Sequence, residues 1–317
     1  MSSSQPSYPR LPSKLILTST KAYFSPSRTI KYLASLLDPA NNILPLLQRH
    51  SAEVLFVLIP DFLTIYPCAQ TLSGAQFSSS AADTGGKDVA SRTPFLPEDK
   101  DLDTSSWPIA LGAQNVYPST TYGAFTGEIV VPGIKQLGCS VVELNHAERR
   151  RYLGEDDATA AAKAAAVSAA HMVPLVCIGE LEKPDLRGPL SQSVGVAMAQ
   201  LRPQIQSVLT AVPHDAPVIF AYEPVWAIGA AEPAGVEYVG PVVQAIRELA
   251  RQIVPQRTAE VKVVYGGSAG PGLWSGKTNG GDGLGKWVDG LFLGRFAHDI
   301  SGVRGVVEEV VESLEMR

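Results

Sequence analysis

The chain has 317 residues, 45% of them hydrophobic, and its 26 basic and 31 acidic side chains give a formal net charge of −5. No basic run accompanies this balance, which argues against a nucleic-acid partner. The longest purely apolar run, Val54–Ile59, is far shorter than the roughly 20 residues that span a bilayer. The polar start of the chain lacks the pattern of a secretory signal. We therefore expect no membrane partner, and the three sparse cysteines, Cys68, Cys139 and Cys177, favour a reducing, cytoplasmic setting.

Eight short apolar runs recur along the chain with helical stretches between them. The runs are residues 15–20, 54–59, 109–114, 141–145, 173–179, 218–223, 261–266 and 290–294. Most are continuous in Val, Ile and Leu, which is typical of parallel strands buried on both faces. The intervening stretches carry helical periodicity, as at 242–253 and 303–314. Eight such alternations predict a single-domain α/β protein, a (β/α)8 barrel. The alternative is an open doubly wound sheet, but no G-x-G-x-x-G follows the first run.

The chain is longer than such a barrel needs, and we assign the surplus to two segments. Residues 1–13 form a polar N-terminal tail, and the barrel occupies residues 14–317. Within it, residues 73–106 are rich in Ser, Gly, Ala and Asp and show no periodicity, so we expect a flexible surface insertion. It precedes the third strand and therefore lies on the face where strands begin, away from the chemistry.

Candidate catalytic residues follow the strands, because barrels of this kind carry their chemistry at the carboxyl ends of the strands. Lys21, His146 and Glu223 end the first, fourth and sixth runs, and glycine-containing turns follow the seventh and eighth. A carboxylate base beside a neutral histidine and a lysine suits proton abstraction next to a carbonyl group. Glycine turns let backbone N–H groups approach a phosphate, since no Cβ intrudes.

Five motifs resemble triosephosphate isomerase. They are GAFTGEI at 123–129, HAERR at 146–150, LVCIGE at 175–180, AYEPVWAIG at 221–229 and YGGS at 265–268. The resemblance implies that Glu223 is the base that moves a proton between adjacent carbons and that neutral His146 polarises the carbonyl oxygen. Lys21 supplies positive charge near the enediolate and the phosphate.

The same resemblance implies a phosphate site and a partner. Gly229, Ser268 and Gly294 would donate to the phosphate of a small sugar substrate, and Ser19 and Arg295 would also line the substrate site. The loop at 114–128 would reach into a second subunit, which implies a homodimer. The reaction needs no metal and no organic cofactor.

The chain departs from the family pattern at several positions near the expected site. Ser19 stands where the family has Asn, Asn145 and Ala147 flank the histidine in place of Gly and Ser, and Arg295 replaces a Gly. The Thr-Ser pair at 18–19 and the GLFLGR segment at 290–295 resemble the erythrulose-phosphate isomerase branch of the family. The guanidinium of Arg295 either contacts phosphate oxygens or fills space left for the ligand.

These observations predict an aldose–ketose isomerase that acts through an enediolate. The first substrate pair is D-glyceraldehyde 3-phosphate and dihydroxyacetone phosphate. A tetrulose phosphate such as an erythrulose phosphate is the alternative substrate. A catalytically silent barrel that binds a phosphorylated ligand is the alternative of a different class.

Overall fold

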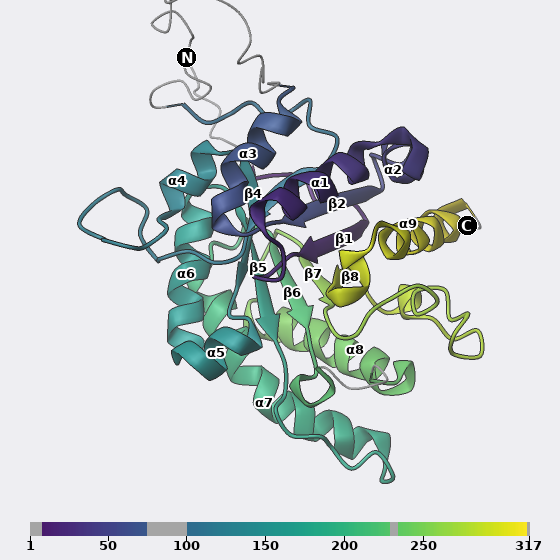
Figure 1. The fold of residues 1–317 in the computed structure, drawn as a ribbon. Helices are drawn as coiled ribbons and strands as arrows, with labels where there is room; N and C mark the ends of the chain where they lie inside the picture. Colours follow the sequence, from purple (N-terminus) through teal and green to yellow (C-terminus); the bar gives the residue numbers. More distant parts are fainter. Residues whose placement is uncertain (1–7, 75–99, 229–233, 316–317) are drawn as a thin grey trace, which may run out of the picture.

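The strands close into a barrel in chain order, and every neighbouring pair is parallel, including β1 with β8 (Figure 1). The computed structural model describes residues 8–74, 100–228 and 234–315. The strands are β1 (Lys14–Ser19), β2 (Val54–Ile59), β3 (Ala110–Ala113), β4 (Cys139–Leu144), β5 (Val173–Ile178), β6 (Val218–Tyr222), β7 (Val261–Tyr265) and β8 (Gly290–Leu293). The predicted (β/α)8 barrel is confirmed, and each strand lies within two residues of its expected bounds.

Helices surround this barrel on the outside (Figure 1). They are α1 (Pro26–Leu37), α2 (Ile43–Arg49), α3 (Phe62–Leu72), α4 (Val131–Gln136), α5 (Ala147–Leu153), α6 (Asp157–Ala169), α7 (Leu190–Ala211), α8 (Val236–Ile253) and α9 (Ile300–Glu315). The apolar stripes expected at 242–253 and 303–314 are the faces that α8 and α9 bury. Side-chain caps fix several helix starts: Ser25 accepts from the N–H of Arg28 before α1, and Asp61 accepts from the N–H of Leu63 before α3.

The core has two layers because successive strand residues point to opposite faces. Leu15 and Leu17 of β1 pack inside the barrel, with Val141 of β4 and Leu175 of β5 among their neighbours in that cluster. Ile16 of β1 belongs to the larger layer between the strands and the helices. Both faces of the strands are thus buried from solvent, which explains the continuous apolar runs of the sequence.

The three cysteines belong to this dry interior. All are free and buried, and burial raises the pKa of the Cys68 thiol to about 12. Burial likewise raises the pKa of Cys139 and Cys177 well above the ordinary thiol value. As neutral thiols they behave as small apolar side chains.

Two predicted segments lie partly outside the described residues. The expected insertion at 73–106 contains residues 75–99, and the tail at 1–13 contains residues 1–7. The described end of the tail contacts the barrel: the Tyr8 hydroxyl donates to the carbonyl of Ser168 at 3.1 Å, and the Tyr8 ring packs against His171.

Candidate active site

A cavity of about 790 Å³ opens at the carboxyl ends of the strands. Its lining includes every expected site residue that the structure describes: Ser19, Lys21, His146, Glu223, Ser268, Gly294 and Arg295. Gly229, the remaining expected phosphate donor, lies outside the described residues. These lining residues lie at or just after the ends of β1, β4, β6, β7 and β8, so the fold brings together side chains that are far apart in the chain.

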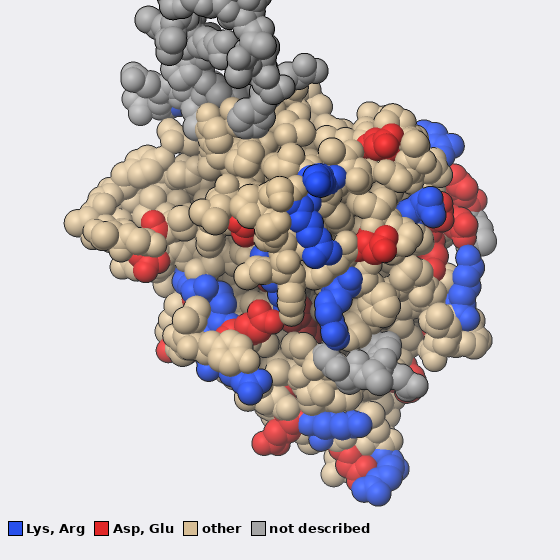
Figure 2. Space-filling view, viewed as in Figure 1, with Lys and Arg blue, Asp and Glu red and all other residues tan. Residues whose placement is uncertain are grey.

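The face of the molecule seen in Figure 2 carries both cationic and anionic side chains, and the two signs lie close together near its centre.

Glu223 is a buried carboxylate at the end of β6. Its N–H donates to the carbonyl of Ile178 at 2.9 Å, which fixes the backbone at the point where the strand ends. Its Oε2 lies 3.6 Å from Nε2 of His146. Burial raises the pKa of Glu223 to about 8, although the charge of Lys21 partly opposes this. A carboxylate with so high a pKa is a stronger base than an ordinary glutamate.

The absence of a side chain at Gly266 leaves space for the carboxylate of Glu223. A Cβ at Gly266 would lie only 2.5 Å from Oε1 of Glu223. Since real Cβ atoms do not approach other atoms so closely, any side chain at 266 would displace the carboxylate. The glycine of the YGGS motif therefore shapes the position of the base as well as the turn.

Burial keeps His146 neutral, and the helix that follows it orients the ring. It is the N-cap of α5, and its Nδ1 accepts from the N–H of Glu148 at 3.1 Å. Burial, with the nearby charge of Lys21, lowers the pKa of His146 to about 4. A neutral imidazole whose Nδ1 accepts must carry its proton on Nε2, the atom that faces Glu223. His146 is therefore a donor aimed into the cavity.

Lys21 supplies the positive charge of the site. Its Nζ pairs with Oε1 of Glu148 at 2.9 Å. Burial alone would lower the pKa of Lys21, but the bond to Glu148 and the charge of Glu223 outweigh it and hold that pKa above its ordinary value. Lys21 adopts a left-handed backbone with φ of 46°, and Gln114 donates to its carbonyl at 3.0 Å. The backbone after β1 is therefore strained, and the side chain of Gln114, which follows β3, holds it in place.

The far end of the cavity has the parts of an anion site. Ser268 follows β7, and Gly294 and Arg295 follow β8, where a short 3-10 helix, η4 (Arg295–His298), begins. A Cβ added at Gly294 would meet no atom within 4 Å, so open space lies beside this backbone. Loops after the seventh and eighth strands are the usual phosphate site of this architecture.

The sequence reasoning missed Glu143, a second buried carboxyl beneath the site. It lies on β4, three residues before His146, and is 3% exposed. Its Oε2 has no hydrogen-bond partner among the described residues, and burial raises its pKa to about 7, opposed by a hydrogen bond from Ser19. The signal was an acidic residue inside an apolar strand, where unpaired carboxylates are rare.

Glu180 was also missed as a supporting residue. Its Oε1 accepts from the hydroxyls of Tyr222 and Tyr238 at 3.2 and 2.8 Å and from the indole of Trp226 at 2.8 Å. Burial raises its pKa. The carboxylate thereby anchors the segment that directly follows Glu223.

The described residues contain no group of three or more His, Cys, Asp or Glu side chains placed to hold a metal ion. Within the same ranges, no helix combines the length and the apolar character needed to cross a bilayer.

Comparisons with known proteins agree with this geometry. The family model described as triosephosphate isomerase matches residues 75–310. L-erythrulose-1-phosphate isomerase of Pectobacterium atrosepticum is 40% identical over 204 residues, which cover 64% of this chain and 72% of that protein. Triosephosphate isomerase of Rhodopirellula baltica is 36% identical over 207 residues, which cover 63% of this chain and 79% of that protein. A neutral active-site histidine is an established trait of triosephosphate isomerase. The chain belongs to the triosephosphate isomerase family of isomerases.

Proposed function

We propose that this protein interconverts two isomers of a phosphorylated sugar of three or four carbons by moving a proton between adjacent carbons. The observation that carries the proposal is the placement of Glu223 Oε2 and His146 Nε2, 3.6 Å apart, in the cavity that also contains Lys21 and the turns after β7 and β8. A base, a neutral donor and a cation around one small ligand are what an enediolate reaction requires.

Each group has one role in the proposed reaction. The Glu223 carboxylate removes the proton next to the carbonyl group and returns it to the neighbouring carbon. The Nε2–H of His146 donates to the oxygen that gains negative charge, and the ammonium of Lys21 stabilises that charge. The backbone around Ser268 and Gly294 binds the phosphate.

The triose pair, D-glyceraldehyde 3-phosphate and dihydroxyacetone phosphate, is the first substrate candidate, since it requires only these groups. A tetrulose phosphate is the second candidate. It is favoured by the name of the relative from Pectobacterium atrosepticum and by the altered positions Ser19, Asn145 and Arg295.

The test is turnover of both substrate classes by the purified protein and by a Glu223→Asp variant. Retracting the carboxylate by one methylene should lower kcat by about a hundredfold or more, because proton transfer depends on sub-ångström placement. Glu248→Asp, the same change at an exposed helix position, is the control and should leave kcat unchanged. Absence of turnover with every three- and four-carbon sugar phosphate would contradict the proposal and favour a silent barrel.

We also propose that the protein is a homodimer in a reducing, cytoplasmic compartment. The loop at 114–128 stands away from the barrel between β3 and α4 (Figure 1), and Tyr122 within this loop is 59% exposed. The resemblance of GAFTGEI at 123–129 to the family motif supports a role in subunit contact. The three free thiols support the compartment.

A further inference from the structure

Helix α5, which begins directly after His146, has no buried side chain among its seven residues. Since so short a helix is not stable by itself, contacts with the rest of the fold must hold it in place. Its first turn supplies the N–H of Glu148, which donates to Nδ1 of His146 at 3.1 Å. The orientation of the imidazole therefore depends on the polar contacts that hold α5.

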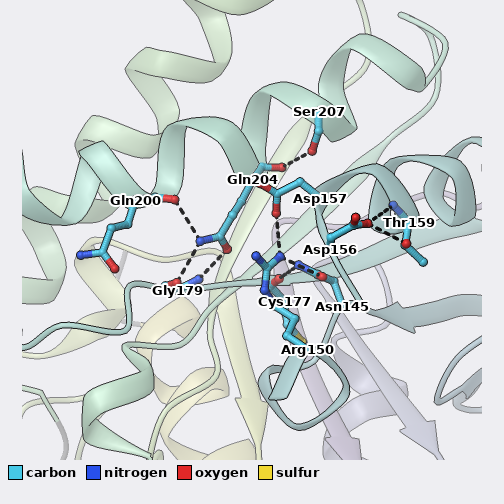
Figure 3. Close-up of polar contacts among 10 residues, drawn as sticks. All are labelled: Asn145, Arg150, Asp156, Asp157, Thr159, Cys177, Gly179, Gln200, Gln204 and Ser207. Carbon is cyan, nitrogen blue, oxygen red and sulfur yellow. Dashed lines mark hydrogen bonds and ion pairs between the residues drawn. The ribbon is translucent and has the colours of Figure 1, made fainter. Parts of the chain in front are cut away.

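Arg150, in the middle of α5, makes two such contacts with one nitrogen atom. Its Nη1 lies 2.6 Å from Oδ1 of Asp157, the first residue of α6, and donates to Oδ1 of Asn145 at 3.1 Å (Figure 3). Asn145 directly precedes His146 in the chain. The guanidinium therefore ties α5 back to the start of the turn that carries the histidine.

Asn145 is itself held against the wall of the barrel. It follows β4, is 1% exposed and adopts a left-handed backbone with φ of 61°. Its Nδ2 donates to the carbonyl of Cys177 on β5 at 2.9 Å (Figure 3). Only one orientation of the amide serves both contacts, because Nδ2 can only donate and Oδ1 can only accept. The side chain of Asn145 thus connects β5 to Arg150 and, through it, to α5.

The backbone at position 145 does not by itself require an asparagine. Glycine adopts this left-handed conformation without a steric penalty, and the family pattern has glycine here. A glycine, however, has no amide to bond the carbonyl of Cys177 and the guanidinium of Arg150. The asparagine therefore adds a connection that the family pattern does not contain.

We propose that Asn145 is a positioning residue for His146. Through Arg150 it holds α5 so that the N–H of Glu148 faces Nδ1 of the imidazole. That bond keeps the imidazole proton on Nε2, the atom that lies 3.6 Å from Oε2 of Glu223. The inference rests on the proposed function, in which this Nε2–H donates to the substrate oxygen.

The tautomer of His146 can be measured without any substrate, by ¹⁵N NMR of protein labelled at the imidazole nitrogens. The spectrum of His146→Gln identifies the signals of this histidine by their loss. The wild-type protein should show one neutral tautomer at neutral pH, with the proton on Nε2. Asn145→Gly and Arg150→Met should each show about a tenth or more of the Nδ1-protonated form, because the bond from Glu148 is no longer held in place.

Two further variants serve as matched controls. Arg150→Lys keeps a single nitrogen that can bond both Asn145 and Asp157, as Nη1 does, and should keep the wild-type tautomer. Arg151→Met removes a guanidinium from the same helix, one that is exposed and lies over the ring of Tyr152, and should also keep it. The signals of the other histidines report whether each variant is folded.

Turnover of the sugar phosphate connects this position to the reaction. In Asn145→Gly and Arg150→Met, kcat should fall about tenfold while KM stays within about twofold of the wild-type value, because the donor acts on charge that develops in the transition state. A purely structural role would instead lower the amount of folded protein and leave kcat per folded molecule unchanged.

Each outcome decides one of the proposals. Both tautomers in the wild-type protein, an unchanged tautomer in Asn145→Gly, or a changed tautomer with unchanged kcat overturns the positioning role and leaves the isomerase proposal intact. Absence of turnover by the wild-type protein contradicts the proposed function instead, and the tautomer measurement then still decides whether Asn145 orients the imidazole.

Discussion

At the scale of single residues, the site contains two buried carboxyl groups, those of Glu223 and Glu143. Burial raises the pKa values of Glu223 and Glu143 to about 8 and about 7, and the charge of Glu143 contributes to the raised pKa of Glu223. Because the proposed reaction needs ionised Glu223, we expect kcat/KM to rise with pH up to about pH 8. A profile that is flat between pH 6 and 8 would contradict this reading of the base.

Glu143→Gln tests the coupling directly. Ionised Glu143 opposes the ionisation of Glu223, so its neutral replacement should lower the pKa of Glu223. The acid limb of kcat/KM should then move to lower pH by about half a unit or more. Glu260→Gln, at an exposed carboxylate that pairs with Lys262, is the control and should leave the limb in place. An unshifted limb in Glu143→Gln would show that the buried carboxyl stays neutral throughout.

The meeting of Glu223 and His146, the proposed catalytic pair, was predictable from the sequence, whereas the groups around that pair were not. Glu223 and His146 stand at strand ends inside specific motifs, so topology alone brings them to one rim. Glu143 and Asn145 act through burial and through contacts across the barrel or with α5. Those contacts depend on side-chain packing, which a linear pattern does not record.

At the scale of elements, η4 carries the largest departure from the family pattern. Arg295 is exposed and lines the anion end of the cavity. We expect Arg295→Gly to raise KM about tenfold for triose and tetrulose phosphates alike, with little change in kcat, because a charge-assisted contact to phosphate is lost from every bound state. An unchanged or lower KM would mean that the guanidinium only occupies ligand space. Arg295→Lys should retain part of the affinity.

Helix α9 is tied to the long β7–β8 connection by one buried carboxylate. Glu309, 7% exposed, accepts from the N–H groups of Gly272 and Ser275. Glu309→Ala should lower the free energy of unfolding by about 2–4 kcal/mol, since two backbone donors lose their partner. Denaturant titration measures this. Glu312→Ala, on an exposed part of the same helix, should change it by less than about 0.5 kcal/mol.

Element positions followed from hydrophobic patterning because parallel strands buried on both faces have little freedom in composition. The strand at 141–145 was the least accurate: β4 begins at Cys139, two residues earlier. Ser140 interrupts the apolar run there, but the strand extends through it because Cys139 already pairs with Leu111 of β3.

At the scale of the whole molecule, the proposed dimer makes a direct prediction. Sedimentation equilibrium should give about twice the 33.7 kDa mass of the chain. Tyr122→Asp, which places a charge at an exposed position of the 114–128 loop, should shift the mass toward that of one chain. Tyr152→Asp, at a similarly exposed tyrosine on α5, should not. A single-chain mass for the wild-type protein would contradict the proposed dimer.

The three sealed thiols give this protein a built-in reporter of barrel opening. Cys68 lies on the outer helix α3, and Cys139 and Cys177 lie on the neighbouring strands β4 and β5, so the three sulfurs sample one helix and two strands of the barrel. A thiolate-seeking reagent meets none of them while the fold is intact, since burial both hides the sulfur and suppresses its ionisation. Labelling rates at the three positions, followed by mass spectrometry, therefore measure how often each region opens. Equal rates would mean that the barrel opens as one unit, and unequal rates that it opens locally.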